Sequence, residues 1–236
     1  MAALRDVTVQ GTGRIKSSIA AGPIGFGVAL KWASATTCLA ATADNSDPGV
    51  IIGFSAQPQD GVVLDKDGFY QLANNSGYPD FVRVIKDGYA NLLVCSKGAY
   101  NILEGDYLEM AILGAAGSGV GVLEEAGAGG NVGETKVTTA LARAEEGIAC
   151  ASMYQHPSAN CEIGDSSIAF TAGNLTSLDV TEGDNIILVD ANGGAQLNRV
   201  KLKTATVITL ALPATNQTAT GDYCYKAFQC LCRITL

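Results

Sequence analysis

The sequence contains little charge, few aromatic residues, a single histidine and no long apolar run. Of its 236 residues, 16% are charged and 6% are aromatic. This composition does not suit a helical bundle, which needs Leu, Glu and Lys, and the sequence lacks the stretch of about 18 apolar residues that a membrane-spanning helix requires. A Ser–His or Cys–His catalytic device would have to use His156, the only histidine. We therefore expect no membrane partner and no enzymatic activity.

Positive charge is also scarce. The chain has 15 Lys and Arg against 23 Asp and Glu, which gives a formal net charge of -8. Because nucleic-acid phosphates would be repelled on average, we expect no nucleic acid as a partner. Arg5 and Asp6 stand where a secretory signal would need an apolar core, which predicts synthesis and folding in a cytosol.

Glycine and short β-branched segments are abundant. There are 28 glycines, and brief alternating apolar runs recur between turn residues. The Asp-Gly pairs at 67–68 and 87–88 each lie between such runs and predict β-hairpins. Across the second pair, Val82 and Leu92 would share an inward face. These patterns predict an all-β fold.

Turn signals divide the predicted strands into two modules. We expect an extended N-terminal arm over residues 1–21 and a small β-barrel over residues 22–148. A loop at 149–166 then leads into a second small β-barrel or sandwich over residues 167–236.

The predicted arm is the one locally basic segment of an acidic chain. It carries Arg5, Arg14 and Lys16, with Asp6 as its only acid. An arm whose charge is opposite to that of its own body can bind a partner, or it can be an ordinary first strand with a solvated face. Both interpretations stay open at this point.

A short acidic motif occurs twice, as ILEGDYLEM and later as VTEGDNIIL. Gly105 and Asp106 in the first copy, and Gly183 and Asp184 in the second, each precede a strand that is followed by a glycine-rich turn. Paired carboxylates can act as acid and base or bind calcium, but Gly-Asp is also what a tight turn requires. No nucleophile or base stands near either copy in the sequence. We interpret both copies as structural turns, and a hydrolase using these aspartates or His156 is the least supported hypothesis.

The seven cysteines form an odd set without a C-x-x-C pair. Most are expected to be buried small hydrophobic residues, as the alternating pattern around Cys230 and Cys232 indicates. A metal site that used Cys224, Cys230, Cys232 and His156 is disfavoured, because Cys230 and Cys232 would need two further ligands in a tetrahedral array. We therefore expect no metal or other cofactor. A disulfide between Cys150 and Cys161 is predicted if the protein reaches an oxidising compartment.

The first 147 residues resemble a known family. The segments GVALKWASATTCLAAT, GVIIGFSAQPQDGV, DGYANLLVCSKGAYNILEGDYLEMAILGAAGSGVGVLEE and TTALARAEEGIA are similar to small capsid decoration proteins of tailed phages, also called cement proteins. Gly105 and Asp106 match the family's Gly-Asp element before an apolar strand, and residues 140–147 resemble its late element. The resemblance ends near Cys150.

The resemblance implies a β-barrel or β-tulip module that binds the outside of a tailed-virus-type capsid and stabilises it. It further implies a homotrimer whose partner is the major capsid protein and whose location is the virion exterior. Arg5, Arg14 and Lys16 are then the expected shell contacts. A different hypothesis comes from Thr- and Asn-rich turns such as PATNQTATGD, which would make the C-terminal half a host-surface or glycan-binding adhesin.

Overall fold

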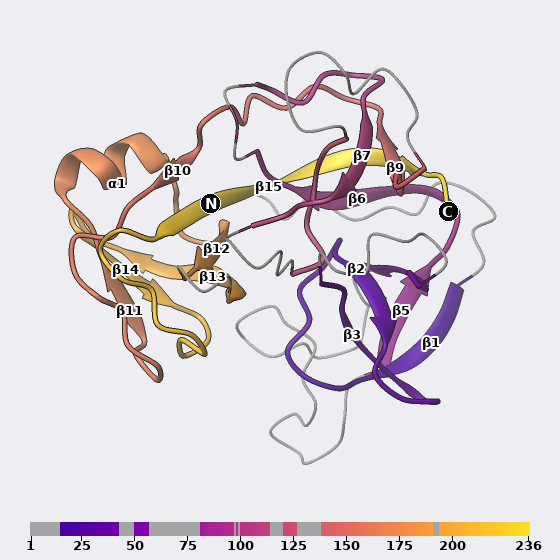
Figure 1. Ribbon diagram of the computed structural model, residues 1–236, viewed down its shortest axis with the longest axis horizontal. Coiled ribbons are helices and arrows are strands. Elements are labelled where there is room, and N and C mark those ends of the chain that lie inside the picture. The colour runs from indigo at the N-terminus through magenta and orange to yellow at the C-terminus, as the bar shows by residue number, and fades with distance from the viewer. Residues whose placement is uncertain are drawn as a thin grey trace.

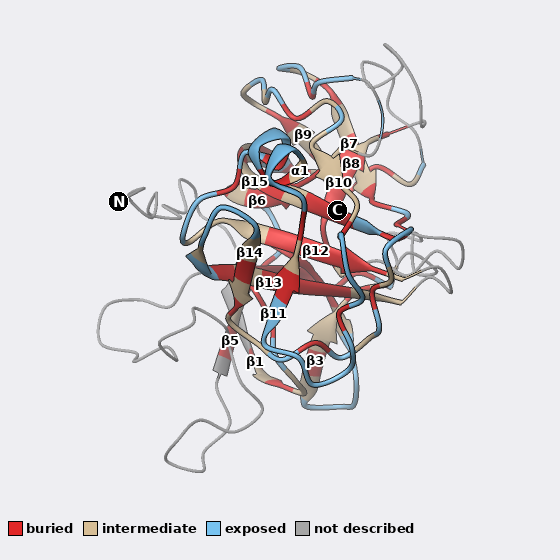
Figure 2. Cartoon of the chain, turned by 90° about the vertical axis from the view of Figure 1, so that its left-hand side faces the viewer, coloured by how far each residue is buried: buried red, intermediate tan, exposed pale blue. Residues whose placement is uncertain are grey.

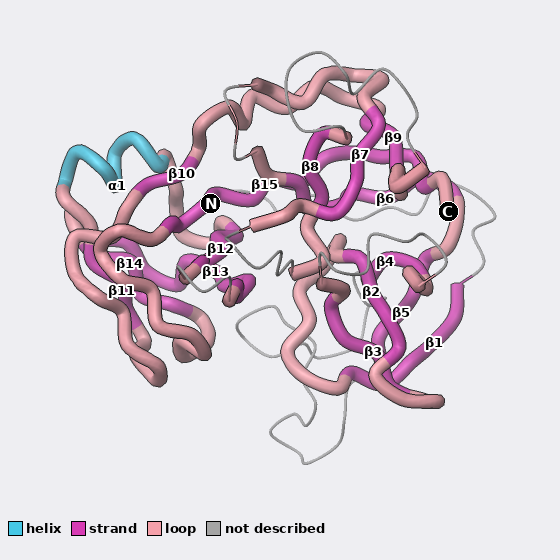
Figure 3. The backbone as a smooth tube through the Cα atoms, in the orientation of Figure 1, coloured by secondary structure: helices cyan, strands magenta, loops and turns pink. Residues whose placement is uncertain are grey.

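The computed structural model of the protein describes residues 15–42, 50–56, 81–96, 98, 100–113, 120–126, 138–190 and 194–236. In this part of the chain the secondary structure is almost entirely β, with one short helix (Figures 1 and 3). The strands form two small closed barrels and a further sheet that continues from the second barrel. The predicted fold class, all-β with two small β modules, is confirmed.

The first barrel is a closed ring of five strands in the order β1-β3-β2-β4-β5. Its strands are β1 (Ile15–Ala20), β2 (Ala29–Trp32), β3 (Thr37–Ala40), β4 (Gly53–Ala56) and β5 (Phe81–Ile85). Antiparallel pairing of β1 with β5 closes the ring. Gly53 has a φ of +138°, and a Cβ there would lie 2.4 Å from the Ile85 carbonyl oxygen. The close approach of β4 and β5 therefore requires glycine at this position.

The second barrel is also a ring of five strands, closed by the C-terminal part of the longest strand. It is built from β6 (Gly88–Val94), β7 (Tyr107–Met110), β8 (Leu123–Glu125), β9 (Ala142–Ala144) and β15 (Tyr223–Ile234). Residues 228–234 of β15 pair with β6, and residues 232–234 also pair with β9 on the other side. The ring is completed by the β6–β8, β7–β8 and β7–β9 pairings.

The remaining strands form a C-terminal sheet that shares β15 with the second barrel. It contains β10 (Tyr154–Gln155), β11 (Ser167–Ala169), β12 (Asn185–Val189), β13 (Ala195–Lys203) and β14 (Val207–Leu210). Its order is β11-β14-β13-β12-β15, with β10 on the other side of β15. Figure 1 shows β15 running from this sheet into the second barrel.

A short helix, α1 (Ala172–Leu178), leads toward β12. It begins where the Thr171 hydroxyl oxygen accepts a hydrogen bond from the Asn174 amide at 3.2 Å, an N-cap that satisfies one free helix donor. Leu175 and Leu178 are its buried residues, and they join the apolar cluster of the C-terminal sheet. The helix therefore covers that sheet with one face only.

Three apolar clusters stabilise the molecule, and two of them cross module boundaries. One joins the first barrel to the C-terminal sheet, for example through Val84 and Ile187. A second fills the second barrel but also includes Phe54 and Ile85 of the first barrel. The third lies within the C-terminal sheet and under α1. Figure 2 shows the buried strands crossing the middle of the molecule, so the modules share their core.

The strand pairings correct three predicted boundaries. The predicted arm over residues 1–21 includes β1, which is a barrel strand rather than a free extension. The predicted barrel over 22–148 is two barrels, and the second of these needs residues 228–234. The predicted loop at 149–166 contains β10. The turn residues in the sequence could not predict these three pairings, because the strands that pair are distant in sequence.

The predicted hairpin at Asp87-Gly88 is also wrong. β5 and β6 flank this turn, but among the described strands β5 pairs with β1 and β4, whereas β6 pairs with β15 and β8. Val82 accordingly lies in the first cluster and Leu92 in the second. The turn passes the chain from one barrel to the other. The Asp-Gly pair at 67–68 lies outside the described residues.

All seven cysteines are buried free thiols. Cys150 lies in the cluster of the second barrel and Cys161 in that of the C-terminal sheet, so the predicted disulfide between them is not formed. Burial raises the pKa of the Cys150 thiol and raises that of Cys161 to about 11. These cysteines are core residues.

We predict that no thiol reacts rapidly in the folded protein, because the thiolate is the reactive form and burial disfavours it. Titration with a chromogenic disulfide reagent in guanidinium chloride, without reductant, should then detect all seven thiols. A count two lower would show that a disulfide forms after all.

Because Cys161 ionises near 9.0 when unfolded and near 11 when folded, the free energy of unfolding should decrease as the pH rises through this interval.

Candidate functional site

The first copy of the repeated acidic motif is a hydrogen-bonded turn. The amide of Asp106 donates to the Leu103 carbonyl oxygen at 3.1 Å, and the Asp106 carboxylate accepts from the Leu103 amide at 2.7 Å. Gly105 has a φ of +97°, as the third residue of a type II turn requires. Asp106 is 3% exposed. Its carboxylate therefore holds the backbone together just before β7 begins.

The second copy repeats this geometry. The amide of Asp184 donates to the Thr181 carbonyl oxygen at 3.1 Å, and its carboxylate accepts from the Thr181 amide at 2.8 Å. Gly183 has a φ of +95°. β12 starts at the next residue and forms a hairpin with β13, just as β7 forms one with β8 after the first copy. Both hairpins agree with the sequence pattern.

An arginine from a neighbouring strand locks each of these two turns. Arg143 Nε donates to the Gly105 carbonyl oxygen at 2.9 Å, and Arg199 Nε donates to that of Gly183 at 2.8 Å. The first arginine comes from β9, across from β7, whereas the second comes from β13, within the hairpin itself. The same local device thus occurs in two different topologies.

Two further turns of this kind were not found from the sequence. The Asp165 carboxylate accepts from the Glu162 amide at 2.8 Å, and the Asp222 carboxylate accepts from the Ala219 amide at 2.7 Å. These turns precede β11 and β15. Their signal in the sequence is a Gly-Asp pair before a strand, without the preceding glutamate that made the other two recognisable as a repeat.

The predicted shell contacts are only partly described. Arg5 and Arg14 lie outside the described residues. Lys16 is in β1, where its backbone stands opposite Val84 of β5. Of the three, only Lys16 can be placed in the fold, at the start of a barrel strand.

His156 belongs to a cluster of four rings, here called the aromatic cluster: Tyr154, His156, Tyr223 and Tyr225. The His156 ring lies 4.7 Å from that of Tyr223, and the Tyr154 ring lies 5.5 Å from both other tyrosines. His156 Nδ1 donates to the Asp222 carbonyl oxygen at 2.8 Å, which places the proton on Nδ1. Burial, followed by nearby thiol and phenol groups, raises the pKa of Tyr225.

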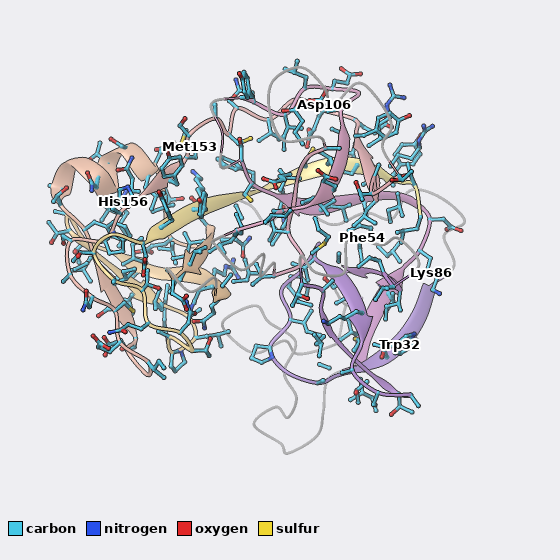
Figure 4. All side chains as sticks on the ribbon, in the orientation of Figure 1. Trp32, Phe54, Lys86, Asp106, Met153 and His156 are labelled. Atoms are coloured by element: carbon cyan, nitrogen blue, oxygen red, sulfur yellow. The ribbon has the colours of Figure 1, made fainter. Side chains whose placement is uncertain are left out.

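The aromatic cluster runs from the core to the surface. Tyr225 is 5% exposed, whereas Tyr223 is 38% exposed. The alternation of Tyr223, Cys224 and Tyr225 in β15 places both tyrosines on one face, a signal that the sequence contained. Figure 4 shows His156 beside α1 and far from Asp106, which lies above the second barrel. The fold thus does not bring His156 and Asp106 of the hydrolase hypothesis together.

The described ranges contain no group of three or more His, Cys, Asp or Glu side chains placed to hold a metal ion. No helix in the part of the chain that the structure describes is long and apolar enough to cross a membrane.

No protein-family model and no curated protein matches this sequence.

The turn at Asp106 yields a stability test. We expect Asp106→Ala to lower the free energy of unfolding by about 1–3 kcal/mol, because it removes the buried carboxylate that accepts the Leu103 amide. Asp106→Asn should cost less, about 1 kcal/mol or below, because an amide oxygen can still accept. Urea unfolding monitored by circular dichroism measures both.

Asp165→Ala, in an exposed turn of the same kind, is the matched control and should lose less than the buried position. An Asp106→Ala protein as stable as the wild type would contradict a structural role for this carboxylate.

Proposed function

We propose that the protein is a structural virion protein that binds the outside of a tailed-virus-type capsid and stabilises it. The proposal starts from the resemblance of the first 147 residues to capsid decoration proteins. Its main support concerns the two elements that carry the resemblance, the Gly-Asp element at 105–106 and the late element at 140–147. These elements are far apart in sequence but lie side by side in the fold. The Gly105 amide donates to the Ala144 carbonyl oxygen at 2.9 Å, and Leu108 pairs with Ala142.

The barrel architecture fits this role physically. Every strand of a closed barrel has a neighbour on both sides, so the ring offers no free edge to other chains. This property suits a protein held at high density on a particle, and a net charge of -8 would oppose aggregation there. Many weak contacts repeated by symmetry can then add up to a large stabilisation of the shell.

The contact segment of this proposal precedes the first barrel. Its basic residues, Arg5 and Arg14, carry charge opposite to the net charge of the chain, and the third expected contact, Lys16, is the second residue of β1. The partner would be the major capsid protein, and the protein would act as a homotrimer on the virion exterior. It has no enzymatic role in this proposal.

Deletion of residues 1–14 tests the contact segment while retaining all of β1. We expect a folded protein with unchanged oligomeric mass by light scattering that no longer pellets with expanded, undecorated tailed-virus shells. The full chain should be a trimer and pellet with them. The double variant Arg5→Glu/Arg14→Glu should behave like the deletion, because it reverses the charge that contacts the shell.

Lys86→Glu is the control, since Lys86 is an exposed base on the loop after β5 and outside the contact segment. Full shell occupancy by the deleted protein would refute the role of residues 1–14 as the contact segment. A full chain that is monomeric and binds none of the shells would refute the capsid role itself.

A second candidate function is favoured by the aromatic cluster. Exposed aromatic rings offer flat apolar faces, and tyrosine combines such a face with a hydrogen-bonding hydroxyl. Tyr223 is 38% exposed, with the His156 ring 4.7 Å away. The rings are packed against one another, so a ligand would lie on them rather than between them. A sugar ring with one apolar face fits such a surface, which supports the adhesin alternative for the C-terminal sheet.

We expect Tyr223→Ala to abolish any glycan binding that the full chain shows on an array, because it removes the exposed ring. The full chain is the appropriate sample, since β15 belongs to the second barrel as well. Tyr89→Ala is the control, because Tyr89 is similarly exposed at 36% but lies on β6. A blank array with the full chain, or equal binding by the two variants, would count against the adhesin.

A further inference from the structure

A pocket of about 180 Å³ lies at the junction of the first barrel and the C-terminal sheet. Pro23 and Ala40 form its wall on the side of the first barrel, and Ala195 and Leu197 of β13 form it on the other side. Val120, just before β8, completes this part of the wall. This junction pocket is therefore built by segments that are distant in sequence.

The wall of the junction pocket indicates an uncharged ligand. Its lining, all drawn from described residues, contains no acidic or basic side chain and is mostly apolar. Burying a charge in such a site would carry a large desolvation cost. Apolar cavities of about 150 Å³ are known to accept a benzene ring, so a pocket of about 180 Å³ has room for a ring with one small substituent.

Gln196 adds a specific polar element. It is 7% exposed and lines the pocket between Ala195 and Leu197. Its Nε2 donates to the Pro213 carbonyl oxygen at 2.9 Å, and its Oε1 accepts from the Thr215 amide at 2.9 Å. A carboxamide has two N–H groups and two oxygen lone pairs, so one of each remains after these bonds. The amide is held in place and has hydrogen-bonding capacity to spare.

We propose that the junction pocket binds a small uncharged molecule with an apolar ring and one amide group. The ring would fill the space between Pro23, Ala40 and Leu197, and the amide group would pair with the remaining donor or the remaining acceptor of Gln196. Such a ligand contacts both the first barrel and the C-terminal sheet. It would therefore stabilise the packing between them. This binding site does not depend on the capsid role proposed above.

Benzamide is the probe that matches this description. We expect it to raise the thermal unfolding temperature of the full chain in a concentration-dependent way, because a ligand that binds only the folded state stabilises it by mass action. Toluene, which lacks the amide, should bind about tenfold more weakly or worse. Benzoate should bind still less, because its charge would be buried in an uncharged wall.

Ala195→Leu should block the pocket by filling it and weaken benzamide binding by about tenfold or more. Ala33→Leu makes the same change on the exposed turn between β2 and β3 and should leave binding unchanged. Ala40→Leu, which fills the pocket from the first barrel, provides the second blocking variant if Ala195→Leu does not fold. Methyl NMR signals of Val120 and Leu197 should shift on titration.

Three results would overturn the proposal. The first is the absence of both a thermal shift and methyl shifts at millimolar benzamide. The second is equal benzamide binding by the filled variants and the Ala33→Leu control, which would place the site elsewhere. The third is equal affinity for benzamide and toluene, which would remove Gln196 from recognition. None of these readouts involves shells, so they are independent of the outcome of the sedimentation test.

Discussion

The fold depends on one strand that serves two sheets. β15 extends over twelve residues. The backbone of its first half pairs with β12 and β10, and that of its second half pairs with β6 and β9. A buried strand whose amides and carbonyls lost these partners would be strongly destabilised. The second barrel and the C-terminal sheet consequently cannot be separated unless one of them loses β15. The apolar clusters shared with the first barrel extend this dependence to the whole chain.

The same local turn, which here is called the Gly-Asp turn, occurs four times in the described part of the chain. A Gly-Asp turn precedes β7, β11, β12 and β15, with the carboxylate accepting the amide three residues earlier in each case. The Gly-Asp turn fixes the direction in which the following strand starts. Its hydrogen bonds lie within the turn, so they do not depend on the strand with which the following strand pairs. This explains why it is found in a barrel and in an open sheet alike. Each carboxylate accepts a backbone amide of its own turn, so the repeat has a structural role in all four places.

Features that depend on local interactions could be predicted from the sequence, whereas those that depend on distant interactions could not. The all-β class and the hairpins after Asp106 and Asp184 were accessible, because turn chemistry and strand alternation are local properties. The partners of β1 and β15 were not, and the Asp87-Gly88 pair was misread, because a turn sequence does not say whether the next strand returns to the same sheet. The alternating tyrosines of β15 could have indicated the aromatic cluster. The junction pocket could not be foreseen, since its walls meet only through long-range packing.

The shared strand also sets the timing of assembly during synthesis. Phe228 of β15 pairs with Val94 of β6, so β6 emerges from the ribosome long before the segment that closes its barrel. At roughly 5–20 residues per second, that interval is on the order of ten seconds. During this interval β6 presents an unpaired edge and an apolar inner face, and β9 adds a second unpaired edge once it has been synthesised. These features promote association between nascent chains. Successful production of this protein thus depends on keeping an incomplete barrel from pairing with its neighbours until its last strand arrives.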